Sequence, residues 1–319
     1  MSVNGSGPAI STMSGVMRQK QPETYVLRLK AVAGDLNVKQ LKRIARVARR
    51  YAKGEVHLST RQGIEIHHVH RDNLEIALKE LREAGVELGA SGTRVRVIVA
   101  CPGEQVCKWG VFDTKRIAGT LDSNYFNQET PSKFKMAVAG CSNNCTKANE
   151  NDIGIRGAIE PAWKAQDCCD CRLCISKCPV AAIDRSESEN GDYRYEIDHD
   201  TCINCSVCTM HCPGEAWFVA RKGYNLFIGG TMGKIPRFAT PLKKLVESEK
   251  ELFLLIEESM AVYRKYARNR ERFGHMIDRI GIEKVTSEIL DAASEKNRKR
   301  ARVKGQARKT ASQEVAERV

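Results

Sequence analysis

The sequence predicts an α+β fold in which a small N-terminal half domain is followed by a mixed α/β domain that a cysteine-rich segment interrupts. Three observations support this prediction. The N-terminal patterns follow the order β-α-β-β-α, two later strands each run into a cysteine motif, and eight regularly spaced cysteines are confined to residues 164–213. The 319 residues are 42% hydrophobic and 29% charged, which suits about two or three folded domains and excludes wholesale disorder.

The N-terminal elements indicate a ferredoxin-like half domain over residues 21–87, preceded by a flexible segment over residues 1–20. Apolar alternation indicates strands, and apolar residues at helical spacing between capping and glycine signals indicate helices. The expected elements are a strand over Thr24–Val32, a helix capped by Asn37 and ending at Tyr51, strands over Glu55–Thr60 and Ile64–Val69, and a helix from about Asn73 to Ala84.

The mixed α/β domain is expected to be discontinuous, with residues 88–163 and 214–293 on either side of the insertion at 164–213. A basic tail over 294–319 is expected to be disordered or frayed. The predicted elements are strands over Arg94–Ala100, Lys135–Ala139 and Asn225–Ile228, and helices over about Pro241–Arg268 and Ile282–Ala293.

The net charge of +13 is unevenly distributed along the chain. Residues 296–319 carry +7, the insertion carries −4, and the rest of the chain carries +10. A basic body of this kind suits an anionic substrate or surface. The tail has no nucleic-acid-binding motif and no interleaved aromatic residues, so no nucleic-acid partner is expected.

The thirteen cysteines suggest metal ligation in a reducing compartment. No apolar run approaches the roughly 20 residues that cross a bilayer, and the first residues lack an apolar signal core. The sequence therefore predicts a cytoplasmic protein without a membrane span.

The insertion contains two copies of the C-x2-C-x2-C-x3-C-P pattern typical of bacterial two-cluster ferredoxins. In that pattern three close thiolates hold one [4Fe–4S] cluster, and the cysteine before proline reaches the other cluster. A pair of zinc sites is the alternative, although zinc modules do not need the third cysteine or the Cys-Pro ending. Cys169 lies outside the pattern, although a register swap with Cys168 remains open. The predicted groups are Cys168, Cys171, Cys174 with Cys212, and Cys202, Cys205, Cys208 with Cys178.

A second set of cysteines, Cys101-x5-Cys107 and Cys141-x3-Cys145, is divided between the ends of two predicted strands. Taken alone, these spacings fit a zinc site, a single cluster or buried thiols. Next to an electron-transfer insertion, they are candidates for the group that consumes its electrons.

The chain resembles the siroheme sulfite and nitrite reductases over roughly residues 15–240. The resemblance implies siroheme and a third [4Fe–4S] cluster on the split cysteine set, with Cys145 bridging the cluster to the siroheme iron. The position of the insertion is similar to that in anaerobic and dissimilatory sulfite reductases. The matching segments are 16–22, 59–63, 100–107, 133–135, 140–145, 151–157 and 223–233.

The resemblance also implies that Arg61, Arg96, Lys133 and Lys135 bind the substrate. A small oxyanion needs cationic donors, because arginine offers a fork for two oxygens and lysine a mobile charge with protons. Lys135 is the sulfite-type residue, whereas plant-type nitrite reductases tend to have asparagine there. We therefore expect six-electron reduction of sulfite to sulfide, with nitrite reduction to ammonia as the alternative.

The chain has the length of one of the two repeats found in full-length assimilatory relatives. A second copy or a homologous subunit is therefore expected to complete the active site. No G-x-G-x-x-G motif follows a strand, so an external donor protein or subunit must supply the electrons. An electron-transfer subunit with a vacant siroheme site is the remaining alternative.

Overall fold

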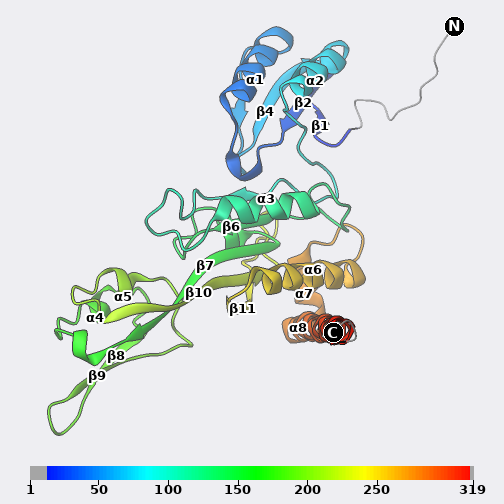
Figure 1. The fold of residues 1–319 in the computed structure, drawn as a ribbon. Helices are drawn as coiled ribbons and strands as arrows, with labels where there is room; N and C mark the ends of the chain where they lie inside the picture. Colours follow the sequence, from blue (N-terminus) through cyan, green and yellow to red (C-terminus); the bar gives the residue numbers. More distant parts are fainter. Residues whose placement is uncertain (1–12, 317–319) are drawn as a thin grey trace.

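The structure is a computed structural model that describes residues 13–316. Two sheets follow one another along the chain, and a small cysteine-rich lobe interrupts the second (Figure 1). No helix within the described range has an apolar stretch long enough to cross a membrane.

The N-terminal sheet has the antiparallel order β1-β2-β4-β3 and packs against two helices. Asn37 caps the first helix through a reciprocal pair of hydrogen bonds with Gln40, as the capping-box pattern requires. Residues 1–12 of the segment expected to be flexible lie outside the described part, but Val16–Arg18 within it pairs with the next strand. The elements are β1 Val16–Arg18, β2 Thr24–Leu29, α1 Val38–Tyr51, β3 His57–Leu58, β4 Ile64–His70 and α2 Leu74–Glu83.

The second sheet has the order β11-β10-β7-β6-β5, in which β5, β6 and β7 are parallel and β7, β10 and β11 are antiparallel. Helices α3 and α6 lie on opposite sides of it (Figure 1). The elements are β5 Val99–Ala100, α3 Thr114–Tyr125, β6 Met136–Ala139, β7 Ile153–Trp163, β10 Trp217–Ile228, β11 Thr240–Val246, α6 Glu249–Tyr266, α7 Phe273–Ile280 and α8 Ile282–Ala316.

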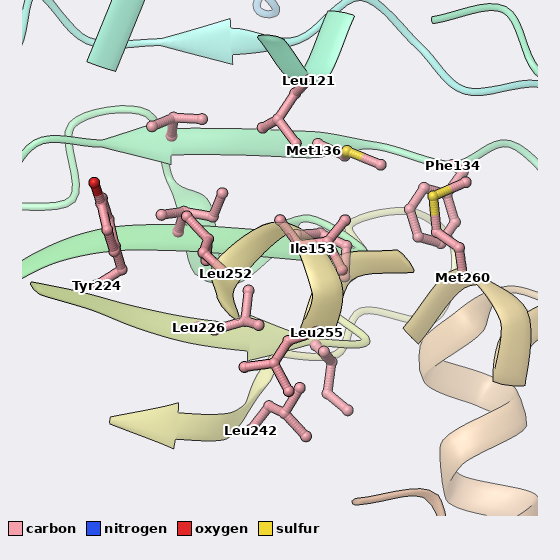
Figure 2. Packing of buried hydrophobic residues seen from close by; sticks show 14 of the residues in the cluster. Leu121, Phe134, Met136, Ile153, Tyr224, Leu226, Leu242, Leu252, Leu255 and Met260 are labelled. Atoms are coloured by element: carbon pink, nitrogen blue, oxygen red, sulfur yellow. The ribbon is translucent and has the colours of Figure 1, made fainter. Parts of the chain in front are cut away.

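Buried side chains from both helices and the sheet form the main hydrophobic core (Figure 2). Leu121 of α3 and Leu255 of α6 approach the sheet residues Met136 and Leu226. All four are at most 1% exposed. This core holds β5 and β6 rigidly, and both cysteine motifs of the split set follow these two strands.

Several sequence expectations for this domain were wrong. Residues 240–246 form a strand rather than the start of a helix, because Leu242 and Val246 suit either periodicity and the free edge of β10 pairs with the segment. The helix begins only after Ser248, whose side chain accepts the Glu251 N–H. The expected strand over Arg94–Ala100 is reduced to β5 and isolated bridges, and α3 and β7 were not predicted from the sequence.

The C-terminal helix also differs from its prediction. Helix α8 continues to Ala316, so the expected tail at 294–319 is helical as far as that residue. Residues 317–319 lie outside the described range. The expected end at Ala293 followed from the loss of apolar periodicity, which does not itself break a helix.

The cysteine-rich lobe is inserted between β7 and β10, whose ends pair through Trp163 and Trp217. It lies beyond the second sheet, at the far end of these strands (Figure 1). Its own small core contains Cys174, Ile183, Tyr195 and Cys208 together with Trp217. The elements are α4 Leu173–Lys177, β8 Ile183–Glu187, β9 Tyr193–Ile197 and α5 Val207–Met210.

Candidate active site

The four cationic residues expected to bind substrate line one cavity of about 250 Å³. We call it the cation pocket. Arg61 lies in the turn between β3 and β4, Arg96 before β5, and Lys133 and Lys135 before β6. Two domains therefore contribute to the pocket, and the fold brings together residues that are up to 74 positions apart in the sequence.

Two further charged residues from the N-terminal sheet line the pocket, Arg28 on β2 and Glu65 on β4. Glu65 is the only carboxylate among the described residues that line it, and it forms an ion pair with Arg28 at 2.8 Å. The remaining cations keep a net positive charge, which favours a small anion in this cavity.

Arg61 is fixed by three hydrogen bonds from its guanidinium group. Nη1 donates to Oδ1 of Asn151 at 2.6 Å, and Nη2 donates to the carbonyl oxygens of Val97 at 3.1 Å and Met136 at 3.4 Å. An arginine side chain has about five N–H donors, so about two donors of Arg61 remain free to bind a ligand. Burial lowers the pKa of Arg61 to about 10, and it therefore stays charged at neutral pH.

Arg96 is held by backbone carbonyls at its own end of the pocket. Nη2 donates to the oxygen of Gly92 at 3.0 Å, and Nη1 donates to that of Ala90. Burial, followed by the nearby charges of Arg28 and Arg272, lowers the pKa of Arg96 to about 10. Its guanidinium group thus also remains charged at neutral pH.

The two lysines are less constrained. In the part of the chain that the structure describes, neither Lys133 nor Lys135 forms a side-chain hydrogen bond or ion pair through Nζ. Burial, followed by the charge of Arg61, lowers the pKa of Lys135 to about 8. Lys135 can therefore hold a proton near neutrality and also release it.

The split cysteine set is brought together by the loops that follow two parallel strands. Cys101 directly follows β5, and Cys141 follows β6 after Gly140. Burial raises the pKa of the Cys141 thiol, and the neighbouring thiols of Cys101, Cys107 and Cys145 raise it further. Cys145 is exposed, whereas the other three are partly buried.

Close backbone packing shapes this site. The Gly140 N–H donates to Sγ of Cys101 at 3.0 Å. A Cβ atom on Gly157 of β7 would lie 2.1 Å from the carbonyl oxygen of Gly140, so only glycine permits this approach. Four thiols, with a backbone N–H directed at one sulfur, form a donor set that fits a [4Fe–4S] cluster.

In the cysteine-rich lobe, one cavity is lined by Cys178, Cys202, Cys205 and Cys208. This grouping joins three thiols of the second sequence pattern to the fourth of the first. Backbone N–H groups of Ala182 and Asn204 approach the sulfurs of Cys178 at 3.3 Å and Cys202 at 3.5 Å. Such N–H···S contacts tune cluster potentials, so this donor set also fits a cluster.

The other cysteines of the lobe are Cys168, Cys169 and Cys171 before α4, Cys174 within α4, and Cys212 after α5. Burial raises the pKa of the Cys174 thiol, and the nearby Cys168 raises it further. Sγ of Cys212 accepts the Trp217 N–H at 3.5 Å. Cys171 and Cys169 are exposed. Among the side chains that the structure describes, no three His, Cys, Asp or Glu residues form a compact site for a single metal ion.

The cation pocket and the split cysteine set occupy opposite ends of the same parallel strands. Arg96 and Lys135 lie before β5 and β6, whereas Cys101 and Cys141 follow them. Five positions separate Arg96 from Cys101 and six separate Lys135 from Cys141. In an extended chain these separations correspond to about 15–20 Å. Along these strands, the cations before β5 and β6 and the cysteines after them thus lie at different ends.

Sequence reasoning missed several residues that build the pocket. Arg28 and Glu65 belong to the alternating pattern of ordinary strands, and no sequence signal marks them. Asn151 and Asp152 belong to a matched segment, but their positions under the pocket required the structure. Arg272 precedes α7, outside every motif, and reaches Asp152 only through the tertiary fold.

The half domain, the five-stranded sheet and its cysteine loops define an α+β iron–sulfur type of fold. Residues 91–304 match the family model described as the nitrite and sulphite reductase 4Fe-4S domain. Residues 17–84 match the nitrite/sulfite reductase ferredoxin-like half domain. The chain belongs to the nitrite and sulfite reductase family, which confirms the resemblance seen in the sequence. The family implies siroheme and a [4Fe–4S] cluster.

Two curated relatives and one solved structure illustrate the similarity. The chain is 32% identical over 281 residues to the coenzyme F420-dependent sulfite reductase of Methanocaldococcus jannaschii, covering 87% of this chain and 44% of that protein. It is 30% identical over 159 residues to one of the subunits of the anaerobic sulfite reductase of Salmonella typhimurium, covering 46% and 47% of the two chains. The chain thus spans less than half the length of either relative.

The crystal structure of dissimilatory sulfite reductase I has the same fold, with a TM-score of 0.69 and 19% identity. The match covers 83% of this chain and 69% of that chain. It supports the mixed α/β architecture and the ferredoxin-like half domain.

Proposed function

We propose that the chain is the siroheme-binding subunit of a sulfite reductase that reduces sulfite to sulfide with six electrons. The convergence of Arg61, Arg96, Lys133 and Lys135 on one cavity carries the proposal. The pocket suits a small oxyanion in charge and size, and relatives of the chain include sulfite reductases.

The side chains of the pocket have complementary roles. The guanidinium groups of Arg61 and Arg96 are fixed by backbone and amide acceptors, so their free N–H donors bind anion oxygens without reorganisation. Lys133 and Lys135 contribute mobile charges, and Lys135 is poised to transfer protons to the leaving oxygens because its pKa is about 8. When bound, siroheme supplies the redox-active iron at which the anion is reduced.

Twelve cysteines are proposed to hold three [4Fe–4S] clusters. The lobe passes electrons from an external donor protein or subunit to the split set, where the exposed Cys145 is the residue proposed to bridge to siroheme. The three groups are Cys101, Cys107, Cys141 with Cys145; Cys178, Cys202, Cys205 with Cys208; and Cys168, Cys171, Cys174 with Cys212.

A second chain is proposed to complete the active site. Because the cation pocket and Cys145 belong to opposite ends of β5 and β6, the cations of one chain serve the siroheme held by its partner. The partner is a second copy or a homologous subunit. The cytoplasm is the proposed compartment, because cluster ligation requires reduced thiols.

Anaerobic purification followed by visible spectroscopy and siroheme quantitation tests this proposal. The expected spectrum has sharp porphyrin-type bands that change when sulfite is added, on top of the broad absorption of the clusters. A spectrum with cluster absorption alone would overturn the enzyme proposal in favour of an electron-transfer subunit. Bands that respond to nitrite but not to sulfite would favour nitrite reduction.

A further inference from the structure

Asn151 and Asp152, directly before β7, form hydrogen bonds with two of the four cationic residues expected to bind substrate. Oδ1 of Asn151 accepts the hydrogen bond from Arg61 at 2.6 Å, and Oδ2 of Asp152 accepts the backbone N–H of Lys135 at 2.8 Å. The parallel pairing of Met136 with Ile153 continues directly from this contact. The position of Lys135 is therefore tied to the carboxylate of Asp152.

Asp152 lies in a buried ion pair. Nη2 of Arg272 lies 2.6 Å from Oδ2 of Asp152, and Nε lies 3.3 Å from Oδ1. The side chains of Arg272 and Asp152 are 8% and 0% exposed. Stability alone explains such a pair poorly, because apolar side chains of similar volume often stabilise a fold as well or better.

The pair also lies within the electrostatic environment of Lys135. The nearby charges with the largest effect on the Lys135 ammonium are Arg61, Arg272 and Lys133, which disfavour its protonated form, and Asp152, which favours it. Arg28, Arg96 and Glu65 also line the cavity that Lys135 faces. Arg272 and Asp152 thus act on Lys135 in opposite directions, and both belong to elements outside its strand.

We propose that the buried Asp152–Arg272 pair is a positioning device for Lys135: it fixes the start of β6 and sets how readily Lys135 holds its proton. Asp152 anchors the lysine backbone and attracts the ammonium, and Arg272 limits that attraction. The consequence for sulfite reduction rests on the proposed function, whereas the effect on Lys135 does not.

Competitive labelling of the holoenzyme with acetic anhydride measures the protonation of Lys135 without any turnover. The rate of acetylation at Lys135 is followed across pH by mass spectrometry and normalised to the exposed Lys250. Asp152→Asn keeps an oxygen for the Lys135 N–H and removes the charge, so the titration midpoint is expected to fall. Arg272→Gln is expected to raise it, each shift being about one pH unit.

The matched control is Asp122→Asn, which removes a buried carboxylate paired with Lys30 at 2.8 Å, away from the cation pocket. It is expected to leave the Lys135 midpoint unchanged. Unchanged midpoints in Asp152→Asn and Arg272→Gln, or shifts of both in the same direction, would overturn the proposal.

Either single variant that folds is sufficient to test the direction of its shift. If neither folds, the double variant Asp152→Ala/Arg272→Gln leaves no unpaired buried charge. With alanine at position 152, this double variant also removes the acceptor of the Lys135 N–H, so hydrogen exchange at that amide is expected to be faster than in the wild type. Unchanged exchange at the Lys135 amide would also overturn the proposal. Because the labelling needs no sulfite, failure of the proposed function would leave this result interpretable.

Discussion

The hydroxyl of Ser142 donates a hydrogen bond to the carbonyl oxygen of Ile203 at 3.1 Å. Ser142 follows Cys141 of the split set, and Ile203 follows Cys202 of the lobe. The loops of two proposed clusters are therefore in direct contact. This contact makes the group of Cys178, Cys202, Cys205 and Cys208 the proposed immediate electron donor to the split set.

Replacing a ligand of that donor group tests the cluster assignment. Cys205→Ser is expected to lose about four of about twelve cluster irons and to block reduction of the split-set cluster by an external donor. Iron analysis and electron paramagnetic resonance measure both effects. Cys169→Ser is the matched control, since this exposed cysteine lies outside the pattern. Equal iron loss in both variants would contradict the assignment.

The pH dependence of anion binding should reflect Lys135. Because burial and Arg61 lower its pKa to about 8, the ammonium is charged below that pH, and sulfite binding should weaken as the pH rises through it. Lys135→Arg should shift this alkaline loss to higher pH, because arginine stays protonated. Spectroscopic sulfite titrations at several pH values provide the measurement. Lys250→Arg, on the exposed surface, should leave the wild-type profile intact.

The backbone contact between Gly157 and Gly140 makes a stability prediction. Gly157→Ala would place Cβ 2.1 Å from the Gly140 oxygen and displace the segment that carries Cys141. A loss of about 1–3 kcal/mol in unfolding free energy is expected, as for other overpacked sites. Gly119→Ala meets no atom within 4 Å inside α3 and should stabilise by about 0.5–1 kcal/mol.

Thermal unfolding of the two glycine variants, together with their iron content, distinguishes these expectations. Equal stability of Gly157→Ala and the wild type would show that β7 does not constrain the split cysteine set.

Mixing two inactive variants tests whether chains share active sites. Cys145→Ala and a Lys133→Ala/Lys135→Ala variant should each be inactive alone. In a mixed dimer of the two, one of the two sites combines intact cations with an intact Cys145, so a random 1:1 mixture, in which about half of the dimers are mixed, should recover about a quarter of the wild-type activity. Activity no greater than that of either variant alone would contradict a site shared between copies.

Much of the fold and the site could be predicted from local patterns. The cap at Asn37 and the apolar periodicity predicted α1 well, and the cysteine spacings predicted which loops carry the thiols. Strand β11 was predicted as a helix because the spacing of Leu242 and Val246 satisfies both periods. The choice between them depends on the edge of β10, which is a tertiary property.

The residues that hold the pocket side chains in place could not be predicted from the sequence either, because their contacts also depend on the tertiary fold. Asp152 and Arg272 are 120 positions apart, and only the tertiary fold brings the residue before α7 to the residue before β7. No local signal distinguishes Arg272 from the other arginines of this basic chain. The role of Arg272 is evident only from its burial and from the short distance between its guanidinium group and the Asp152 carboxylate.

The most direct test of the proposed activity is anaerobic turnover with an artificial low-potential electron donor, in which sulfite and nitrite are supplied separately and together. We expect sulfide as the product, six donor electrons consumed for each sulfite, and a higher kcat/KM for sulfite than for nitrite. Ammonia formation with the higher kcat/KM, or no turnover of sulfite by siroheme-loaded protein, would contradict it.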